Sequence, residues 1–397
     1  MAADKQDKVL NVPNLRFPEY TGEWKTSSVE DCLIRLENGA NYDANDIEGL
    51  PMSRIETIST SHIDYSKVGH SANLKNAEHY KMNYGDILFS HINSVRHIGK
   101  TAYYEAEKPL YHGMNLLLLR CGQEIDSKFF FYLLNNRHFL QRCQVLAKQA
   151  VNQASISISD LRKIGIYVPQ HDEQERIAKF LSIIDERITT QIRIIEDLRN
   201  LKTYIHNRVF SKVNTLFGQR NTIRLSDIAT KITRKNKGNT INNVLSNSAA
   251  MGIVPQAEVF DKEIANEDNT ANYYVIENGD FVYNPRKSAQ APFGPINMYK
   301  GQAKGIISPL YLCFQVTDIN KNYLLHYFMS NVWYSYIYSN GDTGVRHDRV
   351  SIKDETFLNM PLYIHTVDKQ QEIANMMEQV DAKIALEELY LLNSATL

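Results

Sequence analysis

Apolar residues recur at intervals of mostly four and three positions along residues 172–211. Gln191 and Lys202 occupy two positions where this period calls for an apolar side chain. The spacing is typical of the heptad repeat of a coiled coil. A helix of roughly 40 residues would be ~60 Å long, more than a domain of this size needs to cover its own core. The apolar seam consists of Ile177, Leu181, Ile184, Ile188, Ile195 and Leu198, continued by Ile205 and Val209.

The same pattern returns 196 positions later, where EQERIAKFLSIIDERI (173–188) aligns without a gap with KQQEIANMMEQVDAKI (369–384). Two such seams in one chain most simply bury each other. Because the first helix joins the two halves and the second ends the chain, we expect an antiparallel coiled coil with approximate two-fold symmetry. If each helix packed on its own domain instead, the length of the first would be unexplained. The second seam consists of Ile373, Met377, Val380, Ile384 and Leu391, with Glu387 at the position of Gln191.

The part of each half that precedes the long helix carries a second shared pattern. GDILFS (85–90) and GDFVYN (279–284) both predict a strand that begins after a Gly-Asp turn. NLLLLRC (115–121) and PLYLCFQV (309–316) predict buried strands. We therefore expect the same strand arrangement in both halves.

A predicted helix follows in each half, over residues 127–148 and 320–338, with Asp126 and Asp318 as the expected N-terminal caps. These elements indicate an α+β fold class, with two similar domains in tandem repeat and two long helices. The expected boundaries are residues 1–168 for the first domain, 169–212 for the central coiled-coil helix, 213–364 for the second domain and 365–397 for the distal coiled-coil helix.

Composition narrows the class of protein. Apolar residues make up 43% and charged residues 22% of the chain, the balance of a soluble globular protein. The longest apolar runs are too short to cross a membrane, and the N-terminus lacks the apolar core of a signal peptide, so we expect a cytoplasmic protein. The cysteines are too widely spaced for a disulfide framework or a zinc site. They are Cys32, Cys121, Cys143 and Cys313.

The stretch VPQHDEQERIAKFLSIIDERI, continued by QIRIIEDLRNLKTYIHNRVF, resembles the conserved central region of the specificity subunits of Type I restriction-modification systems. VPNLRFPEYTGEWKTSSVEDC near the N-terminus resembles the beginning of that family's first target-recognition domain. The matching residues are Glu173, Gln174, Ile177, Ala178, Asp185, Ile188, Leu201, Lys202 and Phe210 in the first stretch, and Pro13, Leu15, Arg16, Phe17, Gly22 and Trp24 in the second.

The second copy departs from this pattern at three points. His365 stands where the first copy has Pro169, and Lys369 stands where it has Glu173. The sequence also stops at position 397, before position 407, the counterpart of Ser211. These departures concern the end of the distal helix that would dock a partner, and not the two globular domains.

The resemblance implies a DNA-binding subunit that is not an enzyme. Each target-recognition domain would read one half of a bipartite, asymmetric site in double-stranded DNA. The paired helices would set the distance between the half-sites and dock two modification (methyltransferase) subunits. Motor-nuclease restriction subunits would complete a complex that methylates adenine and cleaves DNA. S-adenosylmethionine, ATP and Mg are expected on those partners, and no cofactor or metal in this chain.

Base recognition requires Arg, Lys, Asn, Gln or hydroxyl side chains at base edges, with further contacts to phosphates. Such residues gather after the predicted Gly-Asp strands and in two further stretches of each half. Gln153 and Arg349 align at the lag of 196, so equivalent sites are expected to carry different groups. The candidates in the first half are Ser90, His91, Asn93, Arg96, His97, Lys100, Gln149, Asn152 and Gln153. Those in the second half are Lys231, Arg234, Lys235, Lys237, Asn284, Arg286, Lys287, Gln290, Arg346, His347 and Arg349.

Catalytic motifs are incomplete, so no catalytic residue is expected. Gly99-Lys100-Thr101 ends like a phosphate-binding loop, but Ser94 stands where the earlier glycine is needed. Three alternatives stay open. Each candidate loop residue could simply be a solvated charge, and the chain could be a coiled-coil interaction scaffold without a nucleic-acid role, or a free-standing enzyme.

Overall fold

The computed structural model describes residues 11–42, 48–58, 62–94, 97–149, 153–211, 217–259, 267–342 and 348–395. The chain divides into two compact units, residues 1–187 and 188–397. The first unit includes the start of helix α5 (His171–Phe210), and the second includes the rest of α5 together with α10 (Val367–Ala395). The predicted division into four parts is finer than this one and stays a prediction.

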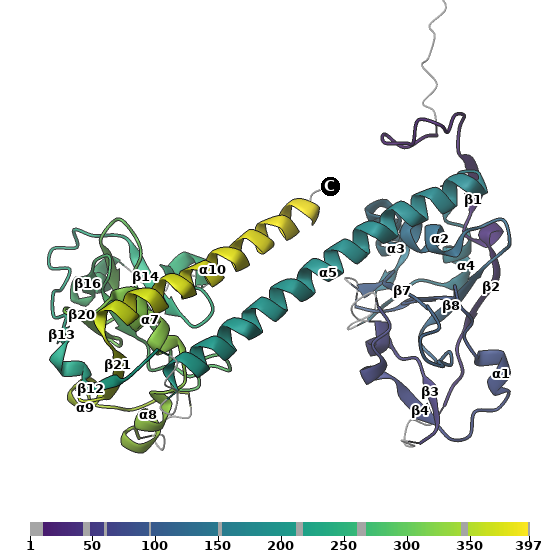
Figure 1. Ribbon diagram of the computed structural model, residues 1–397. Helices are drawn as coiled ribbons and strands as arrows, with labels where there is room; N and C mark the ends of the chain where they lie inside the picture. The colour runs from purple at the N-terminus through teal and green to yellow at the C-terminus, as the bar shows by residue number, and fades with distance from the viewer. Residues whose placement is uncertain are drawn as a thin grey trace, which may run out of the picture. The chain divides into compact units, whose positions relative to one another are not determined.

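The first unit is built on a four-stranded antiparallel sheet in the order β2-β8-β5-β7 (Figure 1). Its strands are β1 (Lys25–Ser28), β2 (Leu33–Asn38), β3 (Leu50–Met52), β4 (Gly69–Ser71), β5 (Ile87–Phe89), β6 (Ile92–Asn93), β7 (Thr101–Tyr103), β8 (Leu117–Cys121), β9 (Lys148–Gln149), β10 (Ala154–Ser155) and β11 (Gly165–Val168). Its helices are α1 (Ala77–Tyr80), α2 (Ser127–Leu134), α3 (Arg137–Leu146) and α4 (Ile158–Arg162), with 3-10 turns at Glu30–Cys32, Ile55–Ile58 and Tyr65–Lys67.

The second unit contains an equivalent antiparallel sheet in the order β13-β20-β17-β18 and a further sheet in the order β15-β14-β19-β16. Its strands are β12 (Arg220–Arg224), β13 (Ala229–Lys231), β14 (Val244–Ser248), β15 (Gly252–Pro255), β16 (Tyr274–Ile276), β17 (Phe281–Tyr283), β18 (Ile296–Met298), β19 (Gly305–Ile307), β20 (Leu312–Val316) and β21 (Pro361–His365). Its shorter helices are α6 (Gln256–Val259), α7 (Lys321–Met329), α8 (Tyr334–Asn340) and α9 (Asp354–Leu358), with 3-10 turns at Leu225–Asp227 and Glu267–Asn272.

Both faces of each central sheet are buried, as the continuous apolar runs predict. In the first unit Ile87 and Leu119 pack against α2, α3 and the start of α5, whereas Leu88 and Leu118 belong to a separate cluster on the opposite face. In the second unit, the side chains of Phe281 and Val282 divide between two clusters in the same way. This alternation is the period of two of a β-strand.

The two predicted Gly-Asp turns are confirmed, and they use the same hydrogen bonds. Gly85 and Gly279 have φ angles of 89° and 86°, a conformation that glycine adopts without a steric penalty. Asp86 Oδ2 accepts a hydrogen bond from the backbone of Asn83 at 2.7 Å, and Asp280 Oδ2 accepts one from Glu277 at 2.8 Å. An arginine then pairs with each aspartate.

Each helix that was predicted after the buried strands is in fact two helices, so those predictions were wrong in extent. In the first unit α2 ends at Leu134, and Asn136 caps α3 by accepting a hydrogen bond from the backbone of Phe139 at 2.8 Å. In the second unit Asn320, and not Asp318, caps α7. Asp318 has a φ angle of 60° and precedes the cap by two residues. Side-chain caps fix helix starts that apolar spacing alone leaves open.

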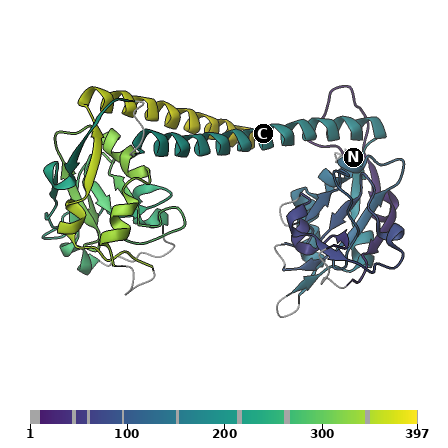
Figure 2. The same cartoon turned by 60° about the horizontal axis from the view of Figure 1, so that its bottom comes forward.

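Helices α5 and α10 pair antiparallel, which confirms that prediction (Figure 2). Gln191 Nε2 donates to Glu387 Oε2 at 2.6 Å and to its backbone carbonyl at 3.1 Å, and Lys202 pairs with Asp381. Gln191 and Glu387 are 196 positions apart, so each faces its own counterpart. A local two-fold axis between the helices therefore passes at this pair. The predicted seam residues of both helices are all buried or half-buried, but not all of them lie between the helices. Ile177 packs against the core of the first unit, and Ile373 and Met377 belong to the core of the second.

Candidate nucleic-acid interface

The chain that leaves β5 in the first unit is held by two short strands from a distant segment. Strand β10 pairs with β6 through Ala154 and Asn93, and with β9 through Ala154 and Gln149. The backbone of Ile156 also donates a hydrogen bond to the carbonyl of His91 at 3.0 Å. Two stretches of predicted candidates, around residue 93 and around residue 150, are thus brought together.

The second unit repeats this arrangement after β17. The backbone of Val350 donates to the carbonyl of Pro285 at 2.9 Å, and Arg286 forms an isolated antiparallel bridge with Arg349. The backbone of Lys287 donates to the carbonyl of Asp348 at 2.8 Å. We call this feature the post-strand ladder: residues 91–93 with 154–156 in the first unit, and residues 285–287 with 348–350 in the second.

The ladder changes one alignment that the sequence suggested. His91 and Pro285 are 194 positions apart, and so are their partners Ile156 and Val350. The structural counterpart of Arg349 is therefore Ser155 and not Gln153. The prediction that equivalent positions carry different groups remains valid at the corrected positions, because a hydroxyl in one unit corresponds to a guanidinium in the other.

The ladder of the second unit is basic at its surface. Arg286 is exposed, whereas Lys287 and Arg349 are half-buried. Within this segment, Asp348 supplies one carboxylate, 3.6 Å from the Nε atom of Arg349. Gln290 follows and is exposed. These side chains combine positive charge with the hydrogen-bond donors that read guanine or contact phosphate.

The ladder of the first unit carries no Lys, Arg, Asp or Glu side chain, and further polar residues lie near it in the sequence. Asn93 is half-buried, and its amide donates to the hydroxyl of Ser90 at 3.3 Å. Gln153 and His97 are exposed, and Lys100 is half-buried. Amide and hydroxyl groups of this kind can pair with base edges in the major groove.

Three of the predicted candidates are buried inside the first or the second unit and are not exposed at its surface. Ser90 and His91 lie directly after β5 with little exposure, and burial lowers the pKa of His91 to about 4. Asn284 occupies the equivalent place after β17, where its amide donates to the carbonyl of Asn247 at 2.9 Å. Its Oδ1 accepts a hydrogen bond from the backbone of Arg286 at 3.0 Å and so positions the exposed arginine.

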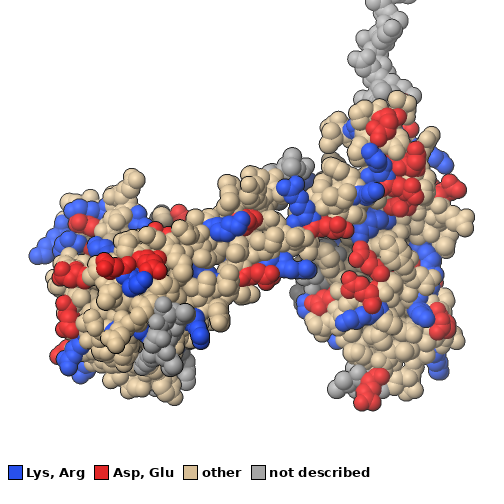
Figure 3. Space-filling model, viewed as in Figure 1, with Lys and Arg blue, Asp and Glu red and all other residues tan. Residues whose placement is uncertain are grey.

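The stretch KITRKNKGN lies apart from the ladder. Lys235 bridges to Tyr274 of β16. Arg234 lies 3.1 Å from Asp280 and 3.4 Å from Glu277, and Lys231 pairs with Asp354 at 2.5 Å, which raises the pKa of Lys231. Lys237 is exposed. In Figure 3, Lys and Arg side chains gather over the β16 side of this unit, while the rest of the visible face carries both signs.

Some predicted candidates lie outside the described residues, and sequence reasoning missed others. Exposed Ser155 in β10 belongs to the first ladder, and exposed Lys148 in β9 pairs with it, although no periodic signal marks either residue. Only the pairing of their strands places them there. The candidates outside the described residues are Arg96, Asn152, Arg346 and His347, together with the side chain of Gln149.

The described residues offer no cluster of three or more His, Cys, Asp or Glu side chains that could bind a metal ion. All four cysteines are free thiols, and three of them are buried. Among the described helices, none is long and apolar enough to span a membrane.

The paired helices expose apolar side chains away from their seam. In the part that belongs to the second unit these side chains point out of the helix pair instead of into it. Exposed apolar surface of this kind is typical of interaction sites when it is contiguous. The residues are Ile192, Ile194, Leu201 and Tyr204 on α5, and Leu386, Leu389, Tyr390 and Leu392 on α10.

Residues 22–198 match the sequence model of the Type I restriction modification DNA specificity domain. A curated protein of Methanocaldococcus jannaschii, which bears the name of the type I restriction enzyme MjaX specificity subunit, is 31% identical over 96% of this chain and 92% of its own.

Two solved structures have a similar fold over nearly the whole chain. One is the S subunit of a Type I restriction-modification system from M. genitalium, with 16% identity, a TM-score of 0.52 and coverage of 94% of this chain and 93% of that one. The other is a chain from a study of complex assembly and conformational transition of the type I R-M system, with 14% identity, a TM-score of 0.55 and coverage of 94% of both chains.

Proposed function

We propose that this chain, which belongs to the specificity subunits of type I restriction-modification systems, recognises a bipartite, asymmetric site in double-stranded DNA. Each of its two target-recognition domains reads one half of that site. The observation that carries the proposal is the post-strand ladder, which keeps the same backbone hydrogen bonds in both units and presents different side chains at equivalent positions.

The side chains of each ladder fit different parts of the recognition task. Arg286 and Lys287 supply the donors that pair with guanine in the major groove, and Arg349 adds a charge that can contact phosphate. Asn93 and Ser155 supply weaker and uncharged groups. Asn284 and Ser90 are buried and form hydrogen bonds with Arg286 and Asn93 of the two ladders. They are not proposed to contact DNA.

The partners in the proposal are two modification (methyltransferase) subunits and the motor-nuclease restriction subunits. The exposed apolar residues of α5 and α10 support docking of the modification subunits, because removal of apolar surface from water by a partner helix is favourable. The chain itself is non-catalytic. S-adenosylmethionine, ATP and Mg would bind to the partners, and the complex would methylate adenine in the cytoplasm and cleave unmodified DNA.

The experiment that tests the proposal is reconstitution with the modification subunit of the same host. The purified chain and that subunit are mixed with S-adenosylmethionine and unmodified genomic DNA, and methylated adenines are mapped at single-base resolution. We expect one bipartite motif whose halves differ and are separated by a fixed spacer. The matched control contains the modification subunit alone and should leave the DNA unmodified.

The same experiment separates the alternatives. A complex that forms but leaves no methylated motif would favour a coiled-coil scaffold without a nucleic-acid role. Methylation by the chain in the absence of the modification subunit would favour a free-standing enzyme. Either result would overturn the proposal.

A further inference from the structure

The loop between β17 and β18 carries the basic side chains of the second ladder. Residues 285–295 include Arg286 and Lys287 and contain no Asp or Glu. Arg286 and Gln290 are exposed, whereas Ala291 and Gly294 are buried on the inner side of the loop. We call residues 285–295 the basic loop.

Backbone hydrogen bonds close the basic loop on itself. At its base, the backbone of Asn284 donates to the carbonyl of Pro295 at 3.0 Å. Gly294 has a φ angle of 85°, and a side chain there would collide with the carbonyl oxygen of Asn284, so the position requires glycine. Nearer the tip, the backbone of Ser288 donates to the carbonyl of Ala291 at 3.0 Å. The loop is therefore closed both at its base and near its tip.

A buried asparagine from the neighbouring sheet holds the base of the basic loop. Asn247 lies in β14 and is only 2% exposed. Its Nδ2 atom donates to the carbonyl of Val282 on β17 at 2.7 Å, and to the carbonyl of Pro295, directly before β18, at 3.3 Å. One amide group thus joins both ends of the loop to the sheet β15-β14-β19-β16.

Two further asparagines connect Asn247 to Arg286. Asn284 Nδ2 donates to the backbone carbonyl of Asn247 at 2.9 Å, and Asn284 Oδ1 accepts from the backbone of Arg286 at 3.0 Å. Asn297 Nδ2 donates to Asn247 Oδ1 at 2.7 Å and to the carbonyl of Ser248 at 3.1 Å. Because both the oxygen and the nitrogen of the Asn247 side chain have partners, its orientation is fixed.

Aromatic side chains hold the other end of the basic loop. The ring of Phe293 lies 5.0 Å from that of Tyr334 and 6.5 Å from that of Tyr338, both on α8. The hydroxyl of Tyr283 donates to the carbonyl of Phe293 at 2.9 Å. The end of the loop is therefore held by aromatic packing and its start by asparagines. Loss of one asparagine should loosen the start of the loop while the end stays packed.

We propose that Asn247 is a positioning residue for the half-site that the second unit reads. It holds the basic loop in the conformation that presents Arg286 and Lys287 to DNA, and it does not contact DNA itself. This inference rests on the proposed function. A loop that is already ordered loses less conformational freedom on binding, so its contacts discriminate better between sequences. The sheet that contains β14 thereby supports recognition without carrying a ladder residue.

The first test examines the basic loop in the free chain, without DNA. Asn247→Ser removes the amide and keeps a small polar side chain. We expect backbone hydrogen exchange of residues 284–294 to become ~10-fold faster, because the loop opens more easily when these hydrogen bonds are lost. The control is Asn320→Ala, which removes a helix cap whose hydrogen bonds go to α7 and α10. It should destabilise the unit without changing exchange in the loop.

The second test measures DNA binding by the complex reconstituted with the modification subunit. The duplexes carry the mapped motif, or that motif with a base change in one half-site or the other. The half-site of the second unit is the one at which Arg286→Ala weakens binding. We expect Asn247→Ser to reduce discrimination there ~10-fold and to leave the other half-site unaffected. Asn320→Ala should leave discrimination at both half-sites unaffected.

Combining Asn247→Ser with Arg286→Ala separates positioning from a general effect on the fold. If Asn247 acts by presenting Arg286, the double variant should discriminate little worse than Arg286→Ala alone, whereas independent losses would multiply. If Asn247→Ser does not fold by circular dichroism, Asn297→Ala replaces it, since it changes a half-buried partner of Asn247. The same pattern of losses is expected.

Three results would overturn the inference: unchanged exchange in the basic loop, equal losses at both half-sites, or multiplying losses in the double variant. Each of them leaves the proposed function intact as long as the unaltered complex reads a bipartite motif. If the unaltered complex reads no such motif, the proposed function fails and this inference fails with it.

Discussion

At the scale of single residues, the two units share a backbone and differ in the side chains that it presents. Arg286 and Arg349 bridge across the ladder of the second unit, and residues 92 and 155 do so in the first. The backbone bridge brings two positively charged residues to one place on the surface of the second unit. Under the proposed function, this charge would favour contact with phosphate or a guanine edge.

Replacing Arg286 and Lys287 by alanine should weaken recognition of one half-site only. We expect a loss of ~1–3 kcal/mol if a bidentate base contact is removed. The measurement is binding of the reconstituted complex to DNA duplexes with a base change in one half-site or the other. The control, Asn93→Ala in the first ladder, should affect the opposite half-site. An equal loss at both half-sites would show that these residues contact phosphate or support the fold.

A buried histidine pair makes the second unit sensitive to acid. The pKa of His206 is lowered to about 3 and that of His326 to about 4, chiefly by burial. Lys202 contributes to both shifts, and His326 contributes to that of His206. The unfolded chain binds protons near the ordinary pKa of ~6.5, so it takes up protons before the folded chain does. The stability that the neutral pair contributes is present above pH ~6.5 and is lost as the pH falls towards about 4.

Replacing His206 by asparagine should flatten this dependence. Between pH ~6.5 and ~4 the slope of the unfolding free energy should fall by up to ~1.4 kcal/mol per pH unit, the value for one proton. Urea unfolding of the Trp24→Phe chain, followed by emission of the buried Trp333, measures it. The same change at exposed His97 is the control and should leave the slope unaltered. An unaltered slope at His206 would contradict the assignment.

At the scale of elements, the pairing of α5 with α10 combines an apolar seam with polar contacts that define its register. Gln191 meets its counterpart Glu387, and Arg199 pairs with Glu388 at 2.7 Å. A polar pair in an otherwise apolar seam specifies register at some cost in stability. Shifting one helix by a heptad keeps the seam in phase but separates Gln191 from Glu387.

Deleting one heptad, residues 192–198, should shorten the spacer of the recognised site. Seven helical residues account for ~10 Å, which corresponds to ~3 base pairs of DNA. Methylation mapping with the reconstituted complex gives the spacer length directly. As a control, deleting only residues 192–195 breaks the heptad phase and should abolish the folded pair. An unchanged spacer after the heptad deletion would show that α5 does not set the separation.

At the scale of the whole molecule, the chain carries the same kind of unit twice. The sheet β15-β14-β19-β16 of the second unit has a shorter counterpart in the first, where β4 pairs with β3 and isolated bridges join Met52 and Lys81 to Tyr111. The frame that repeats consists of the antiparallel central sheet, the Gly-Asp turn, the capped helix and the glutamine that joins it to the long helix. Under the proposed function, two domains on this frame would read two different half-sites, because the repeated hydrogen bonds of the frame come from residues outside the ladder.

A chain with two identical domains should therefore read a symmetric site. Residues 213–364 are replaced by residues 17–168, which correspond to them at the lag of 196. We expect methylation at a site whose two halves are identical, because identical domains would read identical half-sites. The unaltered chain is the control. An asymmetric motif from a chimaera that folds and binds the modification subunit would contradict the proposal.

The sequence by itself determined the long helices, their seam and the repetition, because these depend on a local period that each segment carries in its own residues. The strands after the Gly-Asp turns are local for the same reason. The ends of the shorter helices were harder to predict from the sequence. Whether Asp318 or Asn320 caps α7 depends on which backbone group each side chain can reach.

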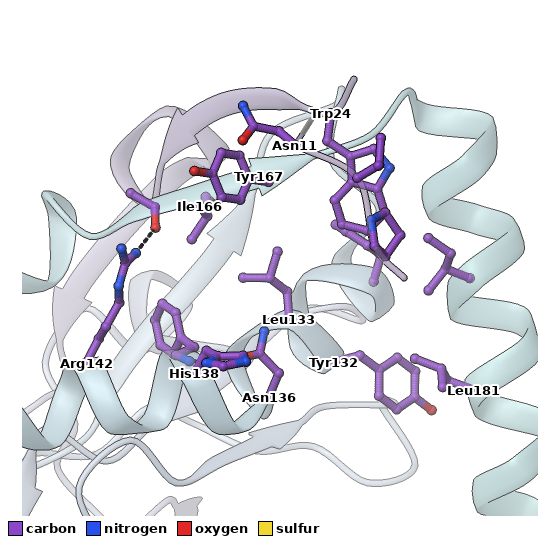
Figure 4. Close-up of a pocket in the computed structure, with 16 residues that line it drawn as sticks. Asn11, Trp24, Tyr132, Leu133, Asn136, His138, Arg142, Ile166, Tyr167 and Leu181 are labelled. Carbon is purple, nitrogen blue, oxygen red and sulfur yellow. Dashed lines mark hydrogen bonds between the residues drawn. The ribbon is translucent and has the colours of Figure 1, made fainter. Parts of the chain in front are cut away.

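Only the tertiary structure decided which candidates share a surface. Asn93 meets Ala154, and Arg286 meets Arg349, across about 60 residues of chain in which no period connects them. Burial separated Asn284, which holds the ladder, from Arg286, which faces solvent. The groove of the first unit that Trp24, Leu133 and Leu181 line (Figure 4) likewise has no sequence signature, because it depends on how distant elements pack.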